Sequence, residues 1–141
     1  MQMDESELHV DEEMEPDPGL NVLTNLIIGA LIAVHKALGA GHMESLYENA
    51  LALEFRSRGI PFERQVAIPV FYRGEKVGDT RIYFIVGEEL KVVVEIKSIE
   101  GLGPIHTAQC ISYLRASGLR LAILANFNVR RLKEGLKRIA L

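Results

Sequence analysis

The stretch Lys91–Ser98 carries Glu95 and Lys97 within a run of aliphatic residues. Its four aliphatic residues predict a β-strand through the middle of a sheet, where an unpaired charge costs several kcal/mol to bury. Glu95 and Lys97 are two positions apart and therefore project from one face of that strand. A carboxylate beside an ammonium can hold a divalent metal and stabilise an anion. A buried salt bridge or a solvated strand end fits the same two residues and is the commoner arrangement.

A hairpin between the expected strands 80–86 and 90–97 would bring further polar groups to this face. A pairing in which opposed residue numbers sum to 178 sets Tyr83 opposite Glu95 and Arg81 opposite Lys97. One face of the hairpin then carries all four polar side chains. The other face is expected to be core, and it carries Ile82, Phe84, Val94 and Ile96.

Two helices are expected to add to the polar set. Glu44 lies in the first turn of a helix over 44–58, where a carboxylate also simply complements the helix dipole. In a helix over 104–117, Gln109 shares one stripe with His106 and Tyr113 at spacings of three and four residues. Such a stripe fits a hydrogen-bond network as well as it fits a site.

The expected elements follow the order ααβββαβα. Helices over 21–38 and 44–58 precede strands over 66–72, 80–86 and 90–97, a helix over 104–117, a strand over 119–125 and a helix over 130–139. The helix between the third and fourth strands indicates a right-handed, parallel crossover. Pro69 cannot donate to a ladder, so its strand belongs at an edge or at a bulge. We expect an α/β (α+β) fold with a mixed sheet of about four strands flanked by helices.

Charge is distributed unevenly along the 141 residues, whose net charge is −3. Residues 1–20 hold eight acidic residues and no Lys or Arg, and we expect a disordered acidic tail there. The remaining chain, 21–141, suits one domain and holds 11 acidic against 16 basic residues. Its net charge is therefore +5.

The last third of the chain is basic, with seven basic residues and one acidic residue over 111–141. This balance suits a polyanionic partner, and it also suits a solvated helix face. The residues expected to contact nucleic acid are Arg81, Arg115, Arg120, Arg130, Arg131 and Lys133.

No membrane partner is expected, because the N-terminus is acidic and the longest apolar run, over 26–34, is too short to span a bilayer. The single cysteine, Cys110, cannot form an internal disulfide. The expected compartment is therefore the cytoplasm.

Five short segments occur in an order and at a spacing that is more specific than any one of them. They are Gly41-x-x-Glu44-x-x-Tyr47, Gly59–Gln65, Val94–Lys97, His106-x-x-Gln109-x-x-x-Tyr113-Leu114 and Asn126–Asn128. Over roughly 21–141 the chain resembles the small prokaryotic GxxExxY proteins of the PD-(D/E)XK nuclease superfamily. That resemblance implies a restriction-endonuclease-like core in which an Asp and a Glu bind Mg²⁺ and a Lys assists the attacking water.

Carried over by position, the resemblance makes Glu95 the metal-binding Glu and Lys97 the motif Lys. Glu44 becomes an extra metal-binding carboxylate from a helix, and Gln109 a supporting helix Gln. One position departs from the family pattern, because Tyr83 stands where the family usually has an Asp. A phenol is a poor Mg²⁺ ligand, so Mg²⁺ is expected to bind weakly, through Glu44 and Glu95, or not at all.

Three functions stay open. The first is a degenerate nuclease fold that binds nucleic acid through a basic face without cutting it. The second is an active Mg²⁺-dependent endonuclease that uses Glu44, Glu95 and Lys97. The third is a non-enzymatic protein-interaction module, for which a homodimer is left open.

Overall fold

A computed structural model describes residues 18–141 of the chain. The elements are α1 (Pro18–Leu38), α2 (Glu44–Ser57), β1 (Phe62–Tyr72), β2 (Glu75–Val86), β3 (Val92–Lys97), α3 (Pro104–Ser117), β4 (Leu121–Asn126), the short 3-10 helix η3 (Leu132–Gly135) and β5 (Leu136–Ala140). Because α1 begins at Pro18, it takes in the last three residues of the expected acidic tail. The rest of that tail lies outside the described residues.

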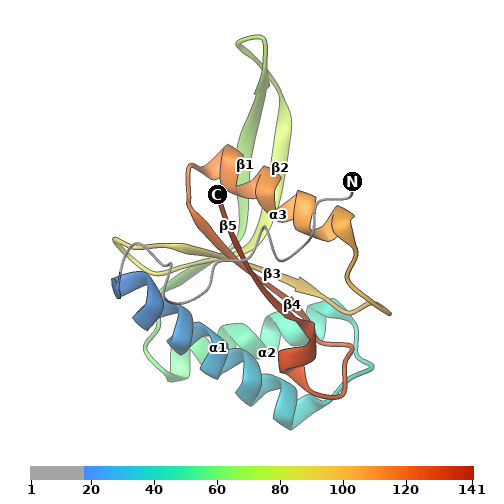
Figure 1. The fold of residues 1–141 in the computed structure, drawn as a ribbon. Helices are drawn as coiled ribbons and strands as arrows, with labels where there is room; N and C mark the ends of the chain where they lie inside the picture. The colour runs from blue at the N-terminus through green and yellow to red at the C-terminus, as the bar shows by residue number, and fades with distance from the viewer. Residues whose placement is uncertain (1–17) are drawn as a thin grey trace.

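The sheet has five strands in the order β1-β2-β3-β4-β5, with α1 and α2 on one face and α3 on the other (Figure 1). The crossover from β3 to β4 is parallel, as predicted, and the other pairs are antiparallel. Each face has its own apolar core: Ile27, Leu31 and Phe55 pack against one side, and Cys110 and Leu114 against the other. The predicted mixed sheet flanked by helices is therefore confirmed, with five strands instead of about four.

Helix α1 is long and apolar enough to cross a membrane by length and composition alone. Its residues Ile27, Ala30 and Leu31 are fully buried against the rest of the domain. This is the pattern of a core helix, with one apolar stripe turned inward.

The helix predicted over 130–139 is wrong, because this segment forms η3 followed by β5. Leu132, Leu136 and Ile139 are spaced as on one helix face, which is why the pattern indicated a helix. The deciding factor is β4, all six residues of which are buried. Its outer main-chain groups need hydrogen-bond partners, and β5 supplies them along Leu121–Ala125.

Gly135 permits the close approach between η3 and β4. A Cβ at this position would lie 2.2 Å from the main-chain oxygen of Asn126. We therefore expect Gly135→Ala to lower the free energy of unfolding by about 1 to 3 kcal/mol, measured by urea denaturation. Gly101→Ala is the matched control, because a Cβ at Gly101 meets no atom within 4 Å. Equal losses in the two variants would contradict this steric account.

The β2–β3 register agrees with the prediction: Phe84, Ile85 and Val86 pair with Val94, Val93 and Val92, so the opposed numbers sum to 178. One side chain of the predicted core face is misplaced. Phe84 packs with α1 and α2, but Ile82 packs with the α3 core. The alternation breaks at Tyr83 because Gln65, which lies opposite it on β1, has a φ of 54° and leaves the ladder.

Strands β1 and β2 continue beyond the body of the domain as a two-stranded ribbon (Figure 1). Strand β1 is an edge strand that contains Pro69, and its register shifts between Val70 and Phe71. Both features agree with the prediction from Pro69. Three large apolar side chains near the tip are mostly exposed: Phe71 at 61%, Tyr72 at 65% and Val77 at 62%.

Candidate functional site

Side chains from five elements meet in a pocket of about 290 Å³, which we call the candidate pocket. It contains all four residues predicted as catalytic and both polar β2 residues of the predicted hairpin face. The lining residues are Glu44 from α2, Gln65 from β1, Arg81 and Tyr83 from β2, Glu95 and Lys97 from β3, and Gln109 and Tyr113 from α3. The β2–β3 register and helix α3, which connects β3 to β4, bring the β2, β3 and α3 residues together, and Glu44 is joined to them by its bonds to Tyr83 and Ser98.

Glu95 lies in the interior part of β3 and is only 2% exposed. Its Oε2 lies 3.5 Å from Lys97 Nζ, and its Oε1 has no hydrogen-bond partner among the described residues. Burial raises the pKa of Glu95 to about 7, with Glu44 adding to the increase and Lys97 opposing it. Near neutral pH this carboxyl group is therefore present in both its protonated and its ionised form.

Glu44 is held by hydrogen bonds at both of its oxygens. Tyr83 Oη donates to Oε1 at 2.7 Å, and the Ser98 main-chain N–H donates to Oε2 at 3.1 Å. Burial and the bond to Glu44 raise the pKa of Tyr83 well above its ordinary value, so the phenol stays neutral. Tyr83, at the position where the family usually has an Asp, is thus a neutral group that donates a hydrogen bond to the Glu44 carboxylate.

The α3 stripe contributes two of its three members to the candidate pocket. Gln109 and Tyr113 line it, and burial together with the charge of Glu95 raises the pKa of Tyr113. His106 does not line it. The Nδ1 atom of His106 accepts a hydrogen bond from the Gly103 main-chain N–H at 2.8 Å, so this residue caps the first turn of α3.

The sequence pattern did not indicate a part-buried network that lies next to the pocket around Glu48. Glu48 Oε2 accepts hydrogen bonds from Arg64 Nη2 and Gln65 Nε2, both at 2.9 Å. Arg81 Nη1 then donates to the Gln65 main-chain oxygen at 3.0 Å, which fixes Arg81 at the pocket. Glu48 follows Glu44 by one helical turn, and that spacing was an available signal. The left-handed backbone of Gln65 has no counterpart in the periodicity of the sequence.

The donor set does not fit a resident Mg²⁺ ion, which the fold family implies. Both Glu44 oxygens already accept hydrogen bonds, and Tyr83 is a neutral phenol. Within residues 18–141, only Glu95 Oε1 is a buried carboxylate oxygen without a hydrogen-bond partner. Across residues 18–141 there is also no group of three or more His, Cys, Asp or Glu side chains that could hold a metal. Mg²⁺ favours several carboxylate or water oxygens in octahedral geometry, which one free oxygen does not provide.

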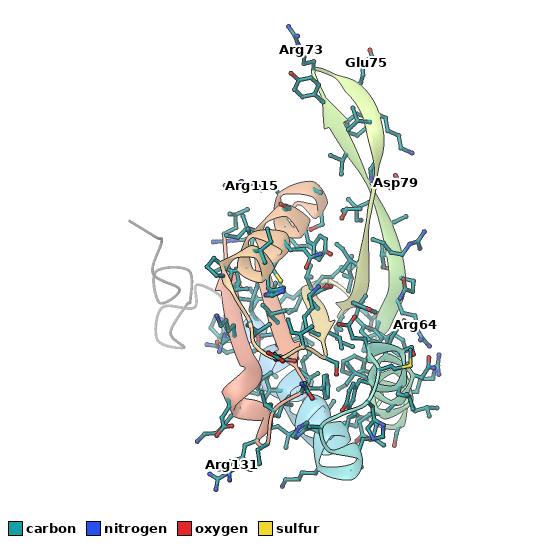
Figure 2. The ribbon with its side chains drawn as sticks, turned by 90° about the vertical axis from the view of Figure 1, so that its right-hand side faces the viewer. Arg64, Arg73, Glu75, Asp79, Arg115 and Arg131 are labelled. Atoms are coloured by element: carbon teal, nitrogen blue, oxygen red, sulfur yellow. The ribbon has the colours of Figure 1, made fainter. Side chains whose placement is uncertain are left out.

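The residues predicted to contact nucleic acid do not form one face. Arg81 lines the candidate pocket, and Arg130, Arg131 and Lys133 line a separate hollow after β4. Arg115, on α3, and Arg120, just before β4, lie toward the start of β4, away from Lys97 and Asn126. Figure 2 shows Arg115 and Arg131 at opposite ends of the domain body. The number of basic residues in a segment of the sequence does not show where their side chains lie in the fold.

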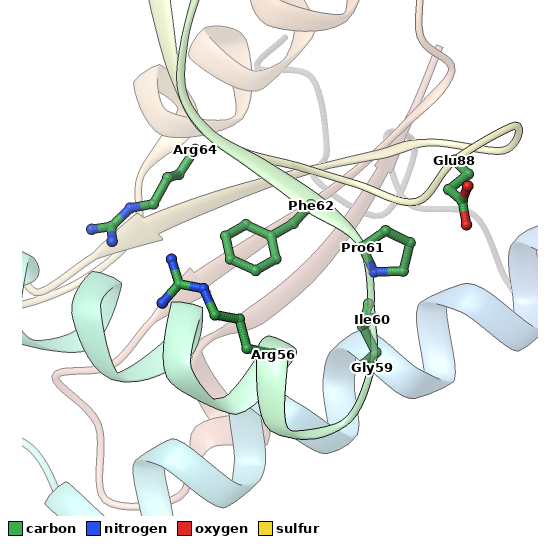
Figure 3. A pocket seen from close by; sticks show the side chains of 7 residues that line it. All are labelled: Arg56, Gly59, Ile60, Pro61, Phe62, Arg64 and Glu88. Carbon is green, nitrogen blue, oxygen red and sulfur yellow. The ribbon is translucent and has the colours of Figure 1, made fainter.

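A further hollow, of about 620 Å³, lies where α2 leads into β1 (Figure 3). The guanidinium of Arg56 lies over the Phe62 ring, 5.4 Å from its centre. Arg64 is bonded to Glu48 and Asn49. The cationic groups of this hollow are therefore already engaged within the domain, and Glu88 adds a negative charge to its lining.

Comparison with known proteins identifies one family. A family model described as the PD-(D/E)XK nuclease superfamily matches residues 21–139. No curated protein and no solved structure matches the chain. The match is to the superfamily, and the narrower resemblance to the GxxExxY proteins stays a prediction.

Proposed function

Because the chain belongs to the PD-(D/E)XK nuclease superfamily, we propose that it is a degenerate member that binds nucleic acid without cutting it. The superfamily membership supplies the nuclease-like fold. The absence of cleavage is inferred from the candidate pocket, because fold alone does not determine activity. The residues proposed to face the nucleic acid there are Arg81 and Lys97, whose positive charges line the pocket.

The hydrogen bond from Tyr83 to Glu44 is the observation that carries this proposal. At 2.7 Å it ties the phenol to a carboxylate that a metal would need. Releasing Glu44 for a metal would leave a buried or half-buried donor unpaired, which costs about 1 to 3 kcal/mol. The candidate pocket holds two cations, and its two carboxylates do not make a strong metal ligand set, which supports phosphate binding without hydrolysis.

Binding to nucleic acid is expected to depend steeply on salt. Each phosphate contact contributes a slope of about −0.9 to a plot of log K against log salt for duplex DNA and about −0.7 for single strands. Arg81→Gln removes one exposed guanidinium and should make the duplex slope less negative by about 0.9. The measurement is fluorescence anisotropy with a labelled duplex and a labelled single strand over a series of salt concentrations.

Arg120→Gln serves as the matched control, because Arg120 is exposed and lies away from the candidate pocket. It should leave the slope unchanged within error. A flat slope for the natural chain would remove nucleic-acid binding and favour a protein-interaction module. Cleavage of either probe in the presence of Mg²⁺ or Mn²⁺ would contradict the proposal that the protein binds nucleic acid without cutting it.

A metal-dependent endonuclease is the second candidate, and one observation favours it. Glu95 Oε1 is buried without a partner next to Glu44 and Lys97, and a cation would satisfy it. This candidate requires Glu44 to leave its present hydrogen bonds. Calorimetric titration with Mg²⁺ separates the two candidates, because only an endonuclease should show binding that is lost in Glu95→Gln.

A further inference from the structure

A second hollow, of about 430 Å³, lies where the C-terminal end of α1 meets the segment after β4. Ile32 and Leu132 supply apolar wall to this hollow, which we call the basic pocket. No acidic residue among those that the structure describes lines it. Its cations are Lys36, Arg130, Arg131 and Lys133, and in the part of the chain that the structure describes none of them has an ion-pair partner.

The segment that carries three of these cations is fixed to the helices. His35 Nε2 donates to the main-chain oxygen of Val129 at 2.8 Å. Phe127, at the start of the segment, is fully buried and stacks on Tyr47 with ring centres 4.4 Å apart. Leu132 is 4% exposed and anchors the other end. The basic pocket is therefore preorganised, which reduces the entropy that a ligand must overcome.

Cations near a helix C-terminus often serve only the free carbonyl groups there. At the end of α1, the carbonyls of His35, Leu38 and Gly39 already have other donors. The Gly39 N–H donates to His35 O at 2.8 Å, and His42 Nε2 donates to Leu38 O at 3.0 Å. Tyr47 Oη donates to Gly39 O at 2.5 Å. These three carbonyls do not need the four cations, whose clustering around one hollow calls for another explanation.

We infer that the basic pocket binds phosphate groups. Two guanidinium forks and two ammonium groups around one hollow match the charge and the acceptor geometry of phosphate, and the volume exceeds that of a single phosphate. The pocket also lies near the same end of the sheet as the candidate pocket. Lys97 pairs with Asn126 across β3 and β4, and the Phe127 N–H donates to Lys97 O at 2.8 Å.

On nucleic acid, the basic pocket would hold backbone phosphates next to those at the candidate pocket. Ser98 Oγ donates to His42 O at 2.6 Å and so fixes the loop that separates the two pockets. Figure 1 shows that this loop, between α1 and α2, and the end of β3 lie on the same side of the domain. This extension rests on the proposed function, whereas phosphate binding by the basic pocket does not.

The direct test is calorimetry of the full chain with inorganic pyrophosphate at low salt. We expect binding to the natural chain and a loss of affinity of about tenfold or more in the double variant Arg131→Gln/Lys133→Gln, because two charge-assisted contacts are removed. Arg115→Gln/Arg120→Gln removes the same charge at the far end of the domain and should change the affinity less than about twofold. Unfolding midpoints check that both variants fold. No binding to the natural chain, or equal losses in both variants, overturns the inference.

A labelled single strand separates the two sources of phosphate. If the pocket holds nucleic acid, Arg131→Gln/Lys133→Gln should make the salt slope less negative by about 1.4, and the Arg115/Arg120 pair should not. An unchanged slope with pocket-dependent pyrophosphate binding identifies a small phosphate ligand instead. If Arg81→Gln fails to alter nucleic-acid binding while pyrophosphate still needs the basic pocket, the proposed function fails and this inference stands.

Discussion

Replacing Tyr83 by aspartate is expected to create a site for divalent metal in a pocket whose present donor set does not fit Mg²⁺. The change removes the donor that occupies Glu44 Oε1 and adds a third carboxylate beside Glu44 and Glu95. Three neighbouring carboxylates repel one another, so the metal-free variant should be less stable than the natural chain. A hard cation with oxygen ligands relieves that repulsion.

The measurement is thermal or urea unfolding with and without Mg²⁺ or Mn²⁺. With a Kd on the order of 0.1 mM, about 10 mM metal would stabilise Tyr83→Asp by about 2.7 kcal/mol. Tyr83→Asn is the control, because asparagine has nearly the same shape as aspartate but carries no charge. Equal metal effects in the Asp and Asn variants would show that the missing carboxylate is not what limits metal binding. Nicking of plasmid DNA by Tyr83→Asp alone would trace the loss of catalysis to this residue.

Glu95→Gln is expected to raise the free energy of unfolding at pH 8 and to change it little at pH 5. Burial raises the pKa of Glu95 from 4.5 to about 7, so the folded chain binds this proton more tightly than the unfolded chain does. As pH rises from about 4.5 to about 7, the unfolded state loses its proton first, and the free energy of unfolding falls. Above pH 7 the full cost of the buried charge remains.

Glutamine keeps the shape of the side chain and carries no charge at any pH. The expected gain at pH 8 is on the order of 2 kcal/mol, since Lys97 loses its partner at the same time. Urea denaturation at several pH values measures it. Glu63→Gln, which removes a carboxylate that is 65% exposed, should have a small effect at every pH. A Glu95→Gln difference that does not vary with pH would show that burial is not what perturbs this carboxyl group.

Local pattern was sufficient to predict much of this fold from the sequence. The helix over 104–117 has its predicted bounds, and the hairpin register follows from the need to keep alternate residues on one face. Pro69 indicated the edge strand because proline has no main-chain N–H to donate to a neighbouring strand. The register and the crossover account for the meeting of Glu95, Lys97 and Gln109, whereas the place of Glu44 in the site was predicted from the family resemblance.

The errors arise where a distant segment decides the local structure. β5 exists because β4 needs a partner along its other edge, whereas its own residues are spaced as on a helix. Ile82 changes sides because of one left-handed residue, Gln65, on the neighbouring strand. The number of basic residues in the last third of the chain did not predict their positions in the fold. Arg115 and Arg131 lie at opposite ends of the domain body (Figure 2). These facts depend on tertiary packing that a single sequence does not encode locally.

The projecting ribbon of β1 and β2 affects the tendency of the protein to aggregate. An edge strand with exposed aromatic residues, such as Phe71 and Tyr72, is a template on which further strands of other molecules can add, as in fibril growth. Pro69 interrupts the row of main-chain donors, and the register shift after Val70 disturbs the regular spacing of the strand. Protection from aggregation is thus concentrated in two consecutive residues of one strand.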